Sequence, residues 1–148
     1  MQKEILLQLL EQSKKDSDTF LNKINTENAS FRLTAATASV GFIYRHIGET
    51  IHLLAQSFGY PTDVEGSTMG QSDSGKEYDL ETSRNLFEQG YATLEKIVNE
   101  TSEEEWLAAV ETHWFGKISR IKLFSITLFH TAHHCGQISS AILKGKVV

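Results

Sequence analysis

Several kinds of residue are scarce in this 148-residue chain, and each shortage excludes a class of protein. Cys135 is the only cysteine, so no disulfide bond can form within the chain and nothing indicates an oxidising compartment. Lys and Arg number 14 against 19 Asp and Glu, with no basic cluster, which argues against binding to a nucleic-acid backbone. The segment at residues 1–16 lacks the apolar core of a signal peptide. We therefore expect a cytoplasmic protein that binds no nucleic acid.

Long hydrophobic runs are also missing. The longest stretch without Asp, Glu, Lys or Arg, Leu123 to Leu143, is about as long as a membrane span. It contains three histidines and Gln137, which are costly to insert into lipid, so we expect it to be buried in a protein and not in a membrane. No Gly-rich phosphate loop, HExxH, GxSxG or CxxC motif occurs, so nucleotide binding has no support.

Apolar side chains at helical spacing predict four helices, and no strand pattern is long enough to build a sheet. The predicted helices cover about residues 2–27, 34–58, 80–98 and 118–143. The second carries only Arg45 and Glu49 as formal charges, so it should be buried over most of its circumference. The length fits one domain, residues 1–148, of the all-α class.

Two connections differ from ordinary short loops. Gly59 to Lys76 holds four of the ten glycines and the only proline, a composition and length typical of a functional or mobile segment that could gate a site. Extended at ~3.3 Å per residue, it could run the length of a bundle and allow helices two and three to be parallel. Ser102 and Glu105 have capping-box spacing, which predicts a short ordered connection before the fourth helix.

The fourth helix has two faces that are not expected to meet solvent. Steps of three and four residues predict a packing seam like that of a coiled coil. The predicted seam is Ile118, Ile121, Ser125, Leu128, Ala132, Cys135, Ser139 and Ile142. At ~100° per residue, His130 and His134 fall on another side, together with Gln137.

His130 and His134 stand at positions i and i+4, so their imidazoles can converge on one cation. A third ligand would come from the second helix, which offers His46 and His52, six residues apart. We choose His46 because it lies near the middle of its helix, at a depth comparable to the pair. Three imidazoles leave a coordination position open, as in catalytic zinc sites. The alternative is a set of hydrogen-bonded core histidines that bind no metal.

The remaining candidates have plainer expected roles. His133 is expected to pack or to support a ligand, and His52 and His113 to lie on the surface or cap helices. Cys135 is expected to be a small buried thiol and not a nucleophile. Glu49 follows His46 by one helical turn and could be a general base or a carboxylate that supports a ligand, but we expect it to be a glutamate on the helix surface.

Two segments, RHIGETIHLL and HTAHHCGQIS, resemble the helix-two and helix-four motifs of the DinB-like (YfiT-like) proteins. This resemblance implies a four-helix bundle in up-down-down-up order, often a homodimer, with a divalent metal on His46, His130 and His134. Zinc or nickel would suit three imidazoles. Many members have arginine at the position of Cys135, so an anion-binding role for that arginine cannot carry over. Members of known activity look like transferases or isomerases that use a thiol such as bacillithiol or mycothiol.

These observations predict a metal-dependent enzyme that activates a thiol or water nucleophile toward a small-molecule substrate. The resemblance favours a low-molecular-weight thiol S-transferase. The alternatives are a metal-dependent hydrolase and a non-catalytic, dimeric metal-binding protein.

Overall fold

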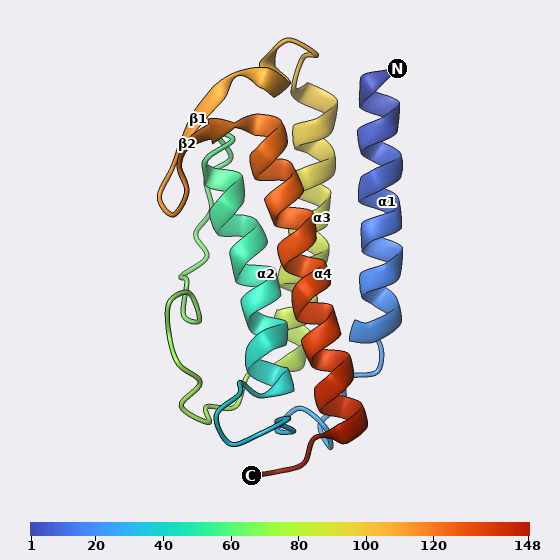
Figure 1. Cartoon of the computed structure of the whole chain (residues 1–148), viewed down its shortest axis with the longest axis vertical. Coiled ribbons are helices and arrows are strands. Elements are labelled where there is room, and N and C mark those ends of the chain that lie inside the picture. Colours follow the sequence, from blue (N-terminus) through green and yellow to red (C-terminus); the bar gives the residue numbers. More distant parts are fainter.

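Four long helices lie side by side in up-down-down-up order, which confirms the predicted four-helix bundle (Figure 1). The computed structural model describes residues 1–148. Its elements are α1 (Gln2–Leu21), α2 (Val40–Gln56), α3 (Leu80–Glu100), the 3-10 helix η1 (Glu105–Leu107), β1 (Ala109–Thr112), β2 (Gly116–Ser119) and α4 (Arg120–Lys144). The long loop after α2 returns along the bundle, so that α2 and α3 run parallel (Figure 1). No helix is long and apolar enough to cross a membrane.

The first two helices are shorter than their apolar patterns predict, because polar side chains make local turns at their ends. After α1, the side chain of Asn25 accepts hydrogen bonds from the N–H groups of Glu27 and Asn28. Before α2, the Ser39 hydroxyl accepts the N–H of Phe42 and caps the helix at Val40, not near residue 34. These side chains offer the backbone partners other than helical carbonyls.

Helix α2 is the most buried of the four, as its lack of charge predicts. Thirteen of its 17 residues are buried. It packs closely on α3, where a Cβ atom added at Gly48 would lie 2.7 Å from Leu86 Cβ, and one added at Gly90 would lie 2.8 Å from Ile51 Cγ2. The two glycines therefore allow a close approach of the parallel helices.

The buried face of α4 lies on a different side of the helix from the predicted packing seam. Its fully buried residues are Leu123, Phe124, Thr127, Thr131, Cys135, Ile138 and Ala141. Of the predicted seam only Cys135 is among them, while Ala132 is exposed. Ile118, Ile121, Leu128 and Ile142 are half-buried at the edge of the core. The alternation of steps was correct, but α1, α2 and α3 together decide which of several apolar stripes is central.

The connection before α4 is ordered, as predicted, but it includes a hairpin that the sequence did not reveal. Ser102 and Glu105 form the predicted capping box, with the Ser102 N–H 2.9 Å from Glu105 Oε2. Trp106 then enters the core, where it is 1% exposed. Strands β1 and β2 pair antiparallel, with Ala109 opposite Ser119. They form an isolated two-stranded ribbon, so no larger sheet accompanies the bundle.

Candidate metal centre

The three predicted ligands meet where α2 and α4 face each other. His46 Nε2 lies 3.2 Å from His130 Nε2, which lies 3.1 Å from His134 Nε2. The three nitrogens all lie within 4.8 Å of one another, and the three side chains are half-buried. The i, i+4 spacing stacks the α4 pair on one face, and His46 meets them from the middle of α2. The structure thus brings together the residues that sequence spacing selected.

Hydrogen bonds to Nδ1 of His46 and of His134 determine the state of Nε2, the nitrogen that faces the other histidines. Thr68 Oγ1 donates its only hydrogen to Glu49 Oε2, at 2.6 Å. Thr68 can therefore only accept from His46 Nδ1, 3.2 Å away, so His46 carries its hydrogen on Nδ1. His134 Nδ1 lies 2.6 Å from the side-chain oxygen of Gln137, which also only accepts. In both rings the lone pair of Nε2 points toward the other histidines.

The three imidazoles are held in their neutral forms. Burial, followed by the neighbouring His134, lowers the pKa of His46 to about 4. Burial and the adjacent His134 and His46 lower the pKa of His130 to about 3. Burial also lowers the pKa of His134, against an opposing hydrogen bond to Gln137. Neutral imidazole is the form that ligates a metal, so no proton has to be removed from a charged ring at neutral pH.

The carboxylate of Glu49 lies behind His46 and is buried, so the expectation of a surface glutamate was wrong. Glu49 is 2% exposed and accepts bonds from the Ser67 hydroxyl at 2.6 Å and from the Thr68 N–H at 2.9 Å. No Lys or Arg forms an ion pair with it. The Thr68 hydroxyl stands between this carboxylate and His46. Of the roles considered for Glu49, this position favours support of a ligand.

This donor set fits a divalent cation. Two nitrogens bound ~2.05 Å from a tetrahedral zinc are separated by ~3.3 Å, close to the 3.2 Å between His46 and His130 and the 3.1 Å between His130 and His134. The His46 and His134 nitrogens lie within 4.8 Å of each other, so this pair would have to approach more closely around a bound ion. The inward lone pairs of His46 and His134 both approach His130 Nε2, whose single hydrogen can serve only one of them, whereas one cation can accept all three nitrogens. A buried carboxylate without a basic partner is also stabilised by a nearby cation. The site could therefore hold zinc, nickel or a similar ion on three imidazoles.

The other sequence candidates lie outside this cluster. His52 was expected at the surface, but it is 8% exposed and its Nε2 lies 2.9 Å from the carbonyl oxygen of Leu86. The helix end is covered by α3, which spacing alone could not show. His133 and His113 are exposed. Cys135 is buried, as expected, and burial raises the pKa of its thiol.

Sequence reasoning did not find Ser67 and Thr68. They lie in the long loop between α2 and α3, where serine and threonine are common and no spacing relates them to a helix. Thr68 is nevertheless 1% exposed, and the next residue, Met69, accepts the Thr50 hydroxyl at 3.0 Å. The middle of the loop is thus fixed against α2.

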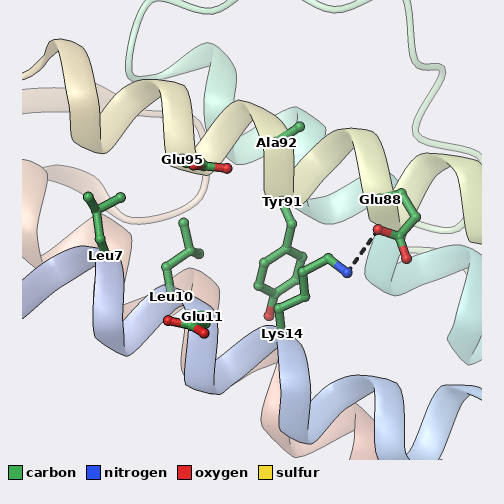
Figure 2. A pocket seen from close by; sticks show the side chains of 8 residues that line it. All are labelled: Leu7, Leu10, Glu11, Lys14, Glu88, Tyr91, Ala92 and Glu95. Atoms are coloured by element: carbon green, nitrogen blue, oxygen red, sulfur yellow. Dashed lines mark ion pairs between the residues drawn. The ribbon is translucent and has the colours of Figure 1, made fainter.

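A concavity of about 390 Å³ lies between α1 and α3, with an apolar floor of Leu7, Leu10 and Tyr91 (Figure 2). Lys14 is paired with Glu88 at 2.9 Å, and no ring nitrogen or thiol lines the groove. The carboxylates there belong to exposed helix faces. The side-chain atoms that could together bind a metal ion are therefore those of the three histidines.

Comparisons with known proteins agree with the fold and with the family that the sequence resembles. The family model described as the DinB superfamily matches residues 9–138. A DinB-like protein from Bacillus cereus is similar over 98% of this chain and 95% of its own, with 16% identity and a TM-score of 0.76. No curated protein matches the sequence.

Two further structures have descriptions that mention an activity. YfiT from Bacillus subtilis, described as a probable metal-dependent hydrolase, has 12% identity, a TM-score of 0.73 and coverage of 93% of this chain and 84% of its own. A variant of a mycothiol-dependent maleylpyruvate isomerase has 17% identity, a TM-score of 0.70 and coverage of 92% and 60%. At these identities the likeness shows the fold alone.

Proposed function

Because this chain belongs to the DinB superfamily, we propose that it is a metal-dependent enzyme whose divalent ion is bound by His46, His130 and His134. The observation that carries the proposal is the convergence of the three Nε2 atoms, two of them with their lone pairs directed inward. We propose zinc or nickel as the ion, since both suit three neutral imidazoles. When bound, such an ion lowers the pKa of a coordinated thiol or water toward neutrality.

The residues of the chain would bind and orient this ion and shape the space beside it. Gln137 and Thr68 hold two of the rings, and burial keeps all three neutral. A cavity of about 440 Å³ reaches Gln137, the partner of His134, and has Leu33 and Ile43 among its lining residues, although none of the three histidines lines it directly. No lysine, arginine or carboxylate lines it. It therefore favours a small substrate with an uncharged part.

Thiol transfer is the reaction that we favour, with a low-molecular-weight thiol as the activated nucleophile. Its support is the structural similarity to an isomerase described as mycothiol-dependent. Hydrolysis, with water in place of the thiol, is the second candidate and is supported by the similarity to YfiT, described as a metal-dependent hydrolase. A non-catalytic metal-binding protein remains the alternative if a fourth protein group closes the site.

The first experiment measures metal content in untagged protein, with His130→Ala and His134→Ala beside the wild type. Near-stoichiometric metal that is lost in both variants supports the proposal. Absence of metal after reconstitution with zinc and with nickel refutes it. A cobalt-loaded sample then tests the open position, because a small thiol that reaches the ion adds a thiolate charge-transfer band to its spectrum. Turnover of electrophiles with and without thiol separates transfer from hydrolysis.

Two further predictions accompany the proposal. The loop at residues 59–76 would gate the site, and its shortening should then change turnover or substrate affinity.

The protein is also predicted to be a homodimer, which sedimentation velocity tests as a species of twice the monomer mass. A monomer at micromolar concentration would contradict the second prediction without affecting the metal site.

A further inference from the structure

A loop residue, Thr68, is placed where it can control one metal ligand. Its side chain is 1% exposed, and its Oγ1 contacts both Glu49 Oε2, at 2.6 Å, and His46 Nδ1, at 3.2 Å. Its backbone N–H also donates to the same carboxylate oxygen. Both the backbone N–H and the hydroxyl of Thr68 are therefore bound to Glu49, and the hydroxyl hydrogen points to the carboxylate.

We propose that Thr68 is a positioning residue for the metal, which links the buried carboxylate of Glu49 to His46 and fixes the nitrogen that faces the ion. This inference rests on the proposed function, because it assigns a role relative to that ion. An imidazole with its hydrogen on Nε2 would direct an N–H group at the ion and could not ligate it. The chain from Glu49 through Thr68 excludes that tautomer before any ion arrives.

The charge of Glu49 acts through the same chain. An ionised carboxylate that accepts the Thr68 hydroxyl makes the hydroxyl oxygen a better acceptor, which strengthens the bond from His46 Nδ1–H and makes Nε2 a stronger ligand. The relay crosses between two parts of the chain, because Glu49 and His46 belong to α2 and Thr68 to the loop. Loop position and metal affinity are therefore coupled: if the loop leaves α2, His46 loses its orientation.

Neighbouring contacts offer a matched control. Thr50 is 2% exposed on α2 and donates its hydroxyl to Met69, the loop residue next to Thr68, but it has no bond to Glu49 or to a histidine. Thr50→Val removes a buried hydroxyl and a loop contact without touching the relay. Thr68→Val removes the relay hydroxyl with little change in shape, and Thr68→Ser restores it.

The test measures the zinc dissociation constant of the full chain by competition with a chromophoric chelator, after circular dichroism has shown that each variant is folded. Thr68→Val should weaken binding about 10-fold to 100-fold, the usual effect of losing a partner of a ligating histidine. Thr68→Ser and Thr50→Val should stay within about threefold of the wild type. If Thr68→Val binds zinc as tightly as the wild type, the inference is wrong.

Nitrogen-15 NMR of histidine-labelled, metal-free protein gives a second readout, which a merely structural role would not change. The His46 ring should show a protonated Nδ1 and an unprotonated Nε2 in the wild type and in Thr50→Val, and a mixture of tautomers in Thr68→Val. The same single tautomer in all three proteins would overturn the inference. Should Thr68→Val not fold, Glu49→Gln serves in its place, because it keeps the shape and removes the charge; unchanged zinc affinity in that variant would refute the relay.

Failure of the inference differs from failure of the proposed function. If the wild type binds no zinc, nickel or cobalt, both are refuted. If the wild type binds metal and His130→Ala does not, while Thr68→Val binds normally, the metal site stands and only the role of Thr68 is refuted.

Discussion

Replacement of Gly48 by alanine should destabilise the protein, although alanine is the better helix former. Gly48 lies in α2, one residue before Glu49, and faces α3. Its new Cβ would lie 2.7 Å from Leu86 Cβ and 3.2 Å from the backbone nitrogen of Phe87. Both obstructing atoms are fixed to the α3 backbone, so no change of rotamer relieves the contact. The helices would have to separate by about 1 Å to reach the ordinary carbon–carbon distance.

The magnitude follows from two opposing effects. Alanine in place of glycine favours a helix by about 1 kcal/mol, whereas overpacking of a well-packed core costs about 1 to 3 kcal/mol. A backbone obstruction belongs in the upper half of that range, so we expect a net loss of about 1 to 2 kcal/mol in the free energy of unfolding. The displacement also moves His46, two residues earlier, so zinc affinity should fall with stability.

Gly136 provides the control, because it also lies inside a helix but has no heavy atom within 4 Å of an added Cβ. Gly136→Ala should therefore stabilise the protein by about 0.5 to 1 kcal/mol. Urea unfolding of the metal-free proteins, followed by circular dichroism, compares the two variants. A Gly48→Ala protein at least as stable as the wild type would refute the close approach of α2 and α3.

Three further predictions concern pH, ligand choice and the loop. The metal-free protein should lose stability as pH falls below ~6.5, because the histidines of the unfolded chain take up protons there. In the folded protein the pKa values of His46 and His130 are about 4 and about 3, so these rings stay neutral. Equal urea midpoints at pH 7.5 and 5 would contradict this prediction. The His52→Ala variant should keep its full metal content in elemental analysis, because His52 Nε2 is hydrogen-bonded to a backbone carbonyl oxygen and not directed at the site. A metal loss as large as that of His46→Ala would show that His52 is a ligand. Asp73→Ala should lower the free energy of unfolding by about 3 kcal/mol, since the Asp73 side chain is 2% exposed and pairs with Arg32 at 2.9 Å. A loss below about 1 kcal/mol, measured by urea unfolding, would show that this ion pair fixes the loop only weakly.

Much of the fold could be predicted because the signals are local. The charge-poor pattern of α2 correctly indicated burial, and the capping box at Ser102 correctly indicated an ordered turn. The hairpin of β1 and β2 was missed because four-residue strands carry too few residues for a periodic pattern. His52 was misplaced because its burial depends on α3, a helix separated from it by the long loop.

The sequence by itself determined the helices and the pairing of His130 with His134, because helical geometry alone places residues i and i+4 on one face. It also narrowed the third ligand to two histidines, of which depth along the helix selected His46. Only the tertiary structure revealed the contacts from Glu49 through Thr68 to His46. Thr68 is a loop residue 22 positions from His46, and no helical or strand periodicity in the sequence relates the two. Spacing was thus sufficient to select the three histidines of the proposed site, whereas the buried carboxylate and the loop hydroxyl beside His46 are brought together only by packing.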